Sequence, residues 1–295
     1  MTHGSSFSGI GGFDLAAEWV GWQNLFNCEI DPFCQTVLKH HFPYAEQFTD
    51  IRTADFAVYR GLIDVFTGGF PCQPFSTAGK QKGTEDDRYL WPEMLGVIRV
   101  VQPRWVVGEN VYGIVSWSDG LVFEQVCADL EAEGYEVQPY VLPACGVGAP
   151  HQRYRTWFVA HRADAGIEDV RERKDEILSG GVASYSESAG LSPCQERQGQ
   201  EQPRRRNERV SIPPNWRNFP TQSPVRRGDD GLSDWLDFDA VFEGILTPRR
   251  AKAYNRWREQ AIKAYGNAVV PQVVLQIFET INEYEALSRA ERSGR

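Results

Sequence analysis

A short apolar run that ends in two glycines is the feature that most constrains the fold of this chain. Residues 62–66 (LIDVF) are rich in branched and aromatic side chains, and Gly68 and Gly69 follow them. This composition predicts a buried strand whose carboxyl end opens into a loop. Cys72 lies in that loop between Pro71 and Pro74. Open α/β sheets bind ligands at the carboxyl ends of their strands, so the thiol is placed where a nucleophile would act.

The alternative role of Cys72 is that of a small apolar side chain filling a gap, which is usual for an isolated cysteine. The flanking prolines and glycines argue against it, because they fix an irregular backbone path that a core filler does not need. The six cysteines include no C-x-x-C pair. We therefore expect reduced thiols, no disulfide framework and no metal site.

The first residues predict a strand, a glycine turn and a helix. Residues 5–7 lead into the turn 8–14, and residues 15–19 have helical character. Gly9 and Gly11 let the backbone approach a ligand closely, as in a first βα turn that binds a nucleotide cofactor. The spacing differs from G-x-G-x-x-G, which disfavours a nicotinamide oxidoreductase.

Acidic residues follow the next two predicted strands. Glu29 comes after a strand at 25–28 and lies twenty residues beyond Gly9, where an acid grips a ribose diol. The alternative is a helix cap, a role that Asp31 fills better for a helix at 32–41. Residues 48–51 indicate the end of a third strand, where the Asp50 carboxylate and the Ile51 side chain would suit an adenine ring. From the residues alone, a surface turn is the favoured interpretation of Asp50.

Two further groups are expected near Cys72. A strand at 104–108 ends at Glu109, and as neighbour of the Cys72 strand it would bring a carboxyl to the same sheet edge. Capping of the next turn is the alternative. Arg153 and Arg155 stand at i and i+2 before a strand at 156–160, so they point the same way and suit an oxygen or phosphate. A surface ion-pair cluster is the alternative there.

Further helices and strands are predicted from the spacing of apolar residues up to about residue 163 and again from residue 247. A helix is predicted at 121–133, a strand at 135–142, a basic and partly helical segment at 249–265, and a final helix from 271 to about 287. The polar, glycine-punctuated residues 73–88 are a candidate lid. No apolar run approaches the ~20 residues that span a bilayer, so we expect a cytoplasmic protein.

Charge is distributed unevenly along the chain. The net charge is −9, yet residues 193–228 contain eight arginines and three glutamates, a net +5. A basic patch on an acidic body fits a protein that contacts polyanions through one face. A solvated charged loop explains the charge equally well. Apolar periodicity fades from about Asp164 to Ser233, which indicates either disorder or a separate loop-rich lobe.

Residues 68–76 (GGFPCQPFS) resemble the catalytic loop of the cytosine-C5 DNA methyltransferases of bacterial or phage type. The likeness continues in order through the glycine turn, Glu109-Asn110-Val111, Arg153-x-Arg155 and residues 266–269 (GNAV). His151 departs from the family pattern Pro-Gln-x-Arg-x-Arg. The resemblance implies a Rossmann-like S-adenosylmethionine-dependent methyltransferase sheet at 1–163, a smaller loop-rich target-recognition domain at 164–246, and a return segment at 247–295 that completes the first domain.

The resemblance also implies site residues. The catalytic group would be Cys72, Glu109, Arg153 and Arg155. Contacts to S-adenosylmethionine would come from Phe7, Gly9, Gly11, Glu29, Ile30, Asp50, Ile51, Pro71, Leu90 and Asn267. Substrate contacts would come from Gln73, Ser76, Arg88, Arg204, Arg205 and Arg206.

The implied reaction is methyl transfer to carbon 5 of a cytosine that is flipped out of double-stranded DNA. A monomer is expected, with a cognate restriction endonuclease as a possible partner. An RNA (tRNA) cytosine methyltransferase of the same fold and a non-catalytic DNA-binding module are the alternatives. Intact Cys72, Glu109 and Arg155 count against the non-catalytic one.

Exchanging residues 164–246 for the equivalent segment of another cytosine methyltransferase is expected to move methylation to the donor's sites. The reason is that base readout depends on side chains of this irregular segment, whereas the flanking segments carry the chemistry. Bisulfite sequencing of methylated DNA would measure the change. A folded, active hybrid that still marks the original sites would contradict this division of labour.

Overall fold

The computed structural model describes residues 1–71, 89–162 and 248–293. Its strands are β1 (Thr2–Ser6), β2 (Gln23–Cys28), β3 (Glu46–Phe48), β4 (Val65–Gly68), β5 (Trp105–Val111), β6 (Glu136–Pro143) and β7 (Tyr154–His161). Its α-helices are α1 (Gly12–Trp19), α2 (Pro32–His41), α3 (Trp91–Val101), α4 (Leu121–Ala132), α7 (Pro248–Asn267) and α8 (Pro271–Ser293). Short 3-10 turns are η1 (Ala57–Tyr59), η3 (Tyr112–Val115), η4 (Trp117–Gly120) and η5 (Ala144–Val147).

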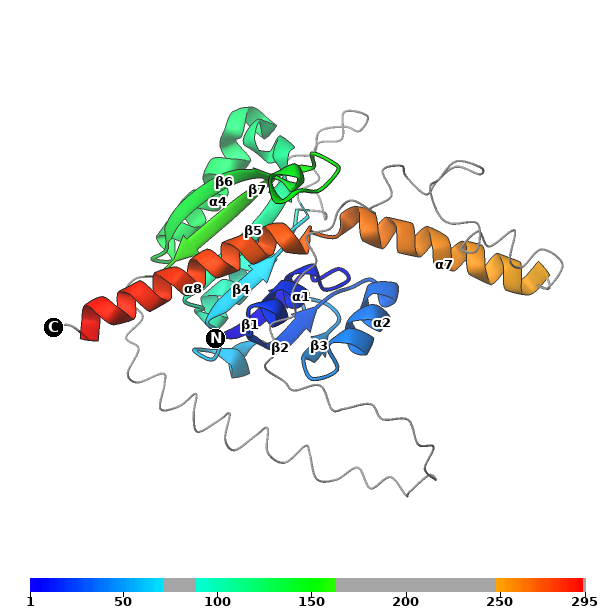
Figure 1. Cartoon of the computed structure of the whole chain (residues 1–295), viewed down its shortest axis with the longest axis horizontal. Coiled ribbons are helices and arrows are strands. Elements are labelled where there is room, and N and C mark those ends of the chain that lie inside the picture. The colour runs from blue at the N-terminus through cyan, green and yellow to red at the C-terminus, as the bar shows by residue number, and fades with distance from the viewer. Residues whose placement is uncertain (72–88, 163–247, 294–295) are drawn as a thin grey trace, which may run out of the picture.

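The strands form one mixed sheet in the order β3-β2-β1-β4-β5-β7-β6 (Figure 1). Strands β1 to β5 are mutually parallel, and β7 runs antiparallel between β5 and β6. Parallel neighbours present their carboxyl ends at one edge, and the antiparallel β7 brings its first residues to that same edge. The sheet is typical of S-adenosylmethionine-dependent methyltransferases, so the predicted fold class is confirmed. The predicted recognition segment lies outside the described residues.

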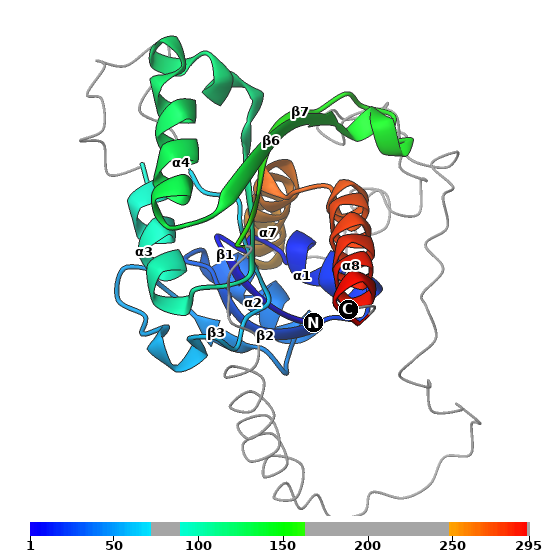
Figure 2. The ribbon, with the colours of Figure 1, turned by 90° about the vertical axis from the view of Figure 1, so that its left-hand side faces the viewer.

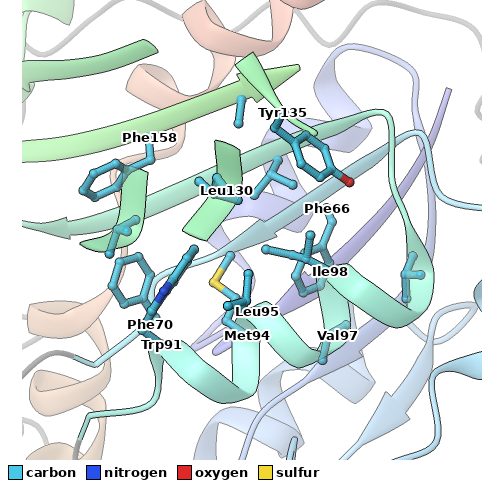
Figure 3. Close-up of a cluster of buried hydrophobic side chains, with 14 of the residues drawn as sticks. Phe66, Phe70, Trp91, Met94, Leu95, Val97, Ile98, Leu130, Tyr135 and Phe158 are labelled. Atoms are coloured by element: carbon cyan, nitrogen blue, oxygen red, sulfur yellow. The ribbon is translucent and has the colours of Figure 1, made fainter. Parts of the chain in front are cut away.

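Helices cover both faces of the sheet (Figure 2). On one face, α3 and α4 pack on the sheet through a cluster that includes the fully buried Phe66, Trp91 and Leu130 (Figure 3). On the other face, α1 and α8 pack through a second cluster that includes Phe13 and Phe278. Strand β4 is buried along its whole length between these layers, as its apolar run predicted.

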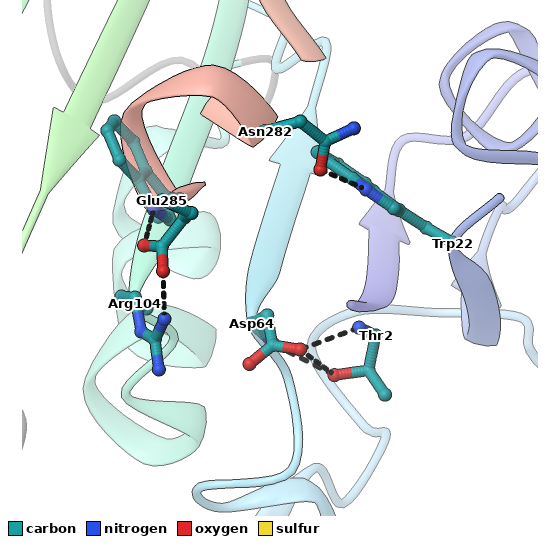
Figure 4. A network of polar contacts seen from close by, with 7 residues as sticks. Thr2, Trp22, Asp64, Arg104, Asn282 and Glu285 are labelled. Atoms are coloured by element: carbon teal, nitrogen blue, oxygen red, sulfur yellow. Dashed lines mark hydrogen bonds and ion pairs between the residues drawn. The ribbon is translucent and has the colours of Figure 1, made fainter. Parts of the chain in front are cut away.

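Polar contacts fix α8 to both halves of the sheet (Figure 4). The Trp22 indole nitrogen, just before β2, donates to Asn282 Oδ1 at 3.0 Å. The Trp105 indole nitrogen on β5 donates to Glu285 Oε1 at 2.9 Å, and Arg104 pairs with the other carboxylate oxygen of Glu285. The last helix is therefore fixed to the sheet at both β2 and β5.

Most predicted elements are confirmed, with shifts at some ends. Helix α2 has the predicted bounds, whereas α8 runs beyond residue 287 to Ser293. The strand predicted at 62–66 starts only at Val65, because pairing with β1 begins there and continues to Gly68. The third strand ends at Phe48 rather than at 51. Glu109 lies inside β5 rather than after it, since β7 extends the pairing to Val111.

Replacing Glu285 by alanine is expected to lower the free energy of unfolding by ~3 kcal/mol, because a largely buried Arg104 and the Trp105 indole lose their acceptor. Urea denaturation would measure the loss. Glu283→Ala, at an exposed position of the same helix, is the control and should stay within about 0.5 kcal/mol of wild type. Equal losses in the two variants would show that Glu285 is not the anchor.

Candidate active site

Glu109 is a buried carboxyl at the carboxyl edge of the sheet. Its Oε1 lies 3.0 Å from Nε of Arg155, which the pairing of β5 with β7 brings alongside. Gly69 follows the neighbouring strand β4, and a Cβ atom added at this glycine would lie 3.3 Å from Oε2 of Glu109. Burial raises the pKa of Glu109 to about 7, although the charges of Arg155 and Arg153 oppose the rise. Near neutral pH the carboxyl can therefore hold or release a proton.

The chain that leads to Cys72 is anchored beside this carboxyl. The Asn110 side-chain amide donates to the carbonyl oxygen of Phe70 at 2.9 Å. The backbone N–H of Leu90 donates to the carbonyl oxygen of Pro71 at 3.2 Å. These bonds hold the residues immediately before Cys72 against β5 and the start of α3. The prediction that the Cys72 strand and the Glu109 strand are neighbours is confirmed.

Several predicted site residues lie outside the described residues. They are Cys72, Gln73, Ser76, Arg88, Arg204, Arg205 and Arg206. Their assignments stay predictions.

The turn after β1 is joined to the turn after β2 through Glu29. The N–H of Gly9 donates to Glu29 Oε2 at 2.7 Å, and the N–H of Asp31 donates to Oε1 at 2.8 Å. Phe7 and Gly9 both have left-handed φ angles, of 50° and 55°. Asp31 caps α2 by accepting from Phe33 N, as the sequence predicted, so Glu29 is not the cap. This leaves the carboxylate of Glu29 at the mouth of the turn.

Asp50 lies in a turn after β3 and is engaged by its neighbour. Both of its carboxylate oxygens accept from Arg52, with Nη2 at 2.7 Å from Oδ2. The hydrogen bonds from the side chain and backbone of Arg52 lower the pKa of Asp50 to about 2. Ile51 packs against the core, whereas Ile30, beside Glu29, is 63% exposed. An exposed apolar side chain at this edge suits a flat ring.

The segment 266–269 reaches the glycine turn from the far end of the sequence. Asn267 is exposed at the last position of α7. A side chain added at Gly12 would lie 2.6 Å from a methyl group of Val269, so only glycine allows this close approach. Arg153 donates to the carbonyl oxygens of Gly266 and Ala268. The structure thus brings Val269, two residues after Asn267, against Gly12, while the Arg153 side chain is bonded to the same segment.

Sequence reasoning did not assign two polar residues that shape the site. Asn110 holds the Phe70 carbonyl, and Ser8 accepts from the N–H of Cys28 at 3.1 Å. Buried Ser5 also donates to Asp14, and burial raises the pKa of Asp14 to about 7. The signal in the sequence was that each of these polar residues follows a predicted strand. The hydrogen-bond partner of each could not be deduced, because it depends on the register between neighbouring strands.

Two features are absent from the part of the chain that the structure describes. No group of three or more histidine, cysteine, aspartate or glutamate side chains is placed to hold a metal ion. No helix in that part is long and apolar enough to cross a membrane.

The fold is that of a methyltransferase sheet, and its carboxyl edge carries the glycine turn after β1 and the buried Glu109–Arg155 pair. Residues 1–207 match the family model described as C-5 cytosine-specific DNA methylase. The chain therefore belongs to this family, whose members use S-adenosylmethionine as methyl donor. The resemblance seen in the sequence is confirmed.

Curated relatives are type II methyltransferases. The chain is 34% identical over 223 residues to M.Eco47II of Escherichia coli, covering 72% of this chain and 54% of that protein. It is 32% identical over 168 residues to M.HhaI of Haemophilus parahaemolyticus, covering 56% and 50%. The chain thus spans about half the length of these relatives.

Solved structures with a similar arrangement include the Dnmt2 methyltransferase of S. pombe, with a TM-score of 0.47 and 22% identity over 59% of this chain and 56% of that one. A Spodoptera frugiperda DNMT2 variant has a TM-score of 0.47 and 23% identity, covering 56% and 51%.

Glu109→Gln is expected to change how stability depends on pH. The folded protein keeps the Glu109 proton to about pH 7, whereas the unfolded chain releases it near 4.5. The stability linked to this group is therefore complete below 4.5 and is lost as pH rises through about 7. Glutamine removes that loss, so the variant should gain on the order of 3 kcal/mol relative to wild type across this window.

Urea denaturation at a series of pH values would measure this difference. Asp14 titrates in both proteins, so its contribution cancels. Parallel stability curves for the two proteins would contradict a raised pKa of Glu109.

Proposed function

We propose that this chain transfers a methyl group from S-adenosylmethionine to carbon 5 of cytosine in double-stranded DNA. The observation that carries the proposal is the buried Glu109–Arg155 pair beside the segment that leads to Cys72. Family membership supports the reaction class. The two groups supply what a cytosine ring needs once a nucleophile has added to it, namely a proton and a nearby cation.

Cys72 would act as the nucleophile. Its thiolate forms a bond to carbon 6 of the ring, and the electron pair of the 5,6 double bond is drawn into the ring, which makes carbon 5 nucleophilic. Bound S-adenosylmethionine supplies the methyl group that carbon 5 takes up. Solvent water then takes the proton from carbon 5, which restores the double bond and expels the Cys72 thiolate, and ring N3 returns its proton to Glu109.

Glu109 and Arg155 would manage the charge that builds up on the ring. Burial raises the pKa of Glu109 to about 7, so a substantial fraction of the carboxyl is protonated near neutral pH and can donate to ring N3 as the thiolate adds. Arg155 would hold the ring oxygen O2 through a charge-assisted hydrogen bond. Its Nε pairs with Glu109, and this pairing keeps the guanidinium beside the carboxyl.

The turn residues fit the proposed cofactor. Each oxygen of Glu29 accepts one backbone N–H, and a carboxylate oxygen has a second lone pair that a ribose hydroxyl can use. Ile30 offers an exposed apolar face for the adenine ring. Asp50 Oδ1 accepts twice from Arg52, but Oδ2 accepts once and so has room for an adenine amino group. The remaining contacts would come from Phe7, Leu90 and Asn267.

The target base must leave the duplex to reach such a site, at a cost of a few kcal/mol. Residues 73–88 would close over the flipped base, and Arg204, Arg205 and Arg206 would contact phosphates. We retain the division into 1–163, 164–246 and 247–295 as part of this proposal. Pairing with a cognate endonuclease is proposed from the type II relatives.

A covalent adduct is expected with DNA that contains 5-fluorocytosine, because fluorine cannot leave carbon 5 as a proton does. A long amplified DNA made with the fluorinated nucleotide contains many short sites and serves as substrate. Wild-type protein with S-adenosylmethionine should give a denaturation-resistant band on an electrophoresis gel. Cys72→Ser should give none, whereas Cys145→Ser, at an exposed free cysteine, should match wild type.

Two further arms complete the experiment. Omitting S-adenosylmethionine should reduce the adduct, because trapping follows methyl transfer. Fluorinated transfer RNA should give none. An adduct on transfer RNA alone would favour the RNA enzyme, and an unchanged yield in Cys72→Ser would remove Cys72 from the mechanism.

A further inference from the structure

Arg153 adopts a strained backbone conformation at the head of β7. Its φ angle is +34°, a left-handed value that residues other than glycine rarely adopt. Such a conformation is energetically unfavourable and persists only where the surroundings determine it. Arg155, two residues further, makes the pair with Glu109. The strain therefore sits next to the proposed base site.

The side chain of Arg153 spans two carbonyl groups at the end of α7. Nη1 donates to the carbonyl oxygen of Gly266 at 3.0 Å, and Nη2 donates to that of Ala268 at 2.7 Å. The planar fork of arginine matches two acceptors at once, which the single ammonium of lysine does not. These carbonyls flank Asn267, a proposed cofactor contact.

The same segment contacts the cofactor turn on its other side. Val269 closes against Gly12, with its carbonyl oxygen 3.1 Å and a methyl group 2.6 Å from the place of an added side chain. The turn and Val269 are therefore in close contact, so a shift of the turn toward residues 266–269 would displace them. Arg153 is bonded to these residues and would follow.

Arg153 also acts on the catalytic pair through its charge. Together with Arg155 it opposes the rise in the pKa of Glu109. Burial, and to a smaller extent the charge of Arg155, lower the pKa of Arg153. A movement of Arg153 would therefore alter the field at Glu109 and the position of Arg155 on the same strand.

We infer that Arg153 is a positioning residue that couples occupancy of the cofactor turn to the Glu109–Arg155 site through residues 266–269. This inference rests on the proposed function, because it needs a cofactor in the turn. The competing explanation is that Arg153 merely caps the end of α7, as basic side chains near helix C-termini do. A cap would support folding but would transmit nothing.

Hydrogen exchange with mass spectrometry separates these explanations. The ligand is S-adenosylhomocysteine, the demethylated product, added to saturation so that differences in affinity do not matter. In wild-type protein it should slow exchange both at the turn, residues 8–12, and at the head of β7, residues 153–156. The expected slowing at β7 is about 5-fold or more, the lower end of typical coupling between sites.

In Arg153→Met the turn should still be protected, while protection of the β7 head is lost. Arg153→Lys keeps the charge and one hydrogen bond. Its protection of the β7 head should therefore be intermediate between that of wild type and that of Arg153→Met. Arg99→Met is the matched control, because Arg99 forms an exposed ion pair with Glu133 away from this site, and it should behave as wild type. If Arg153→Met does not fold, Arg153→Lys decides.

Three outcomes are decisive. Equal protection of β7 in wild type and in the Arg153 variants would leave Arg153 as a cap and overturn the inference. Protection of the turn alone in wild type would also overturn it, since nothing is transmitted. Failure of wild type to bind the product at all would instead overturn the proposed cofactor, which isothermal titration would show separately.

Discussion

The parallel pairing of β4 with β5 is the constraint on which the site depends. Gly68 lies opposite Gly108 in this pairing. Two residues further along each chain, Phe70 lies beside Asn110 and accepts its hydrogen bond. This register sets where the chain can leave the sheet toward residue 72. A slip of one residue would turn every side chain to the opposite face and remove Glu109 from the edge. Packing of Phe66 and Met94 on one face resists such a slip.

Placing a carboxyl at this edge has a cost that the surroundings only partly offset. Burial penalises the charged form of Glu109, and two nearby arginines return part of that penalty. A stronger ion pair would hold the carboxylate permanently ionised, and an apolar pocket would hold it permanently protonated. The observed balance keeps both protonation states accessible, which is what acid–base chemistry at neutral pH requires.

The sequence was sufficient for the elements with clear periodicity and for the adjacency of the Cys72 and Glu109 strands. Short apolar runs and glycine turns carry that information locally. It was insufficient for Asp50, whose partner Arg52 lies only two residues away but binds through a turn that no periodicity marks. Likewise, the bonds of Arg153 to residues more than a hundred positions away depend on how α7 meets the sheet. Residues 164–246 offered composition alone.

Helix α8 has a consequence for how the molecule is assembled. Its contacts with Trp22 and Trp105 join residues 260 and 180 positions apart, so they form only when residues 282 and 285 have left the ribosome. Until then the apolar face of α1 and the adjoining strands remains uncovered. Closing such distant contacts is slow, and exposed apolar faces invite association between chains. During that period the nascent sheet exposes an apolar face through which it can associate with other chains.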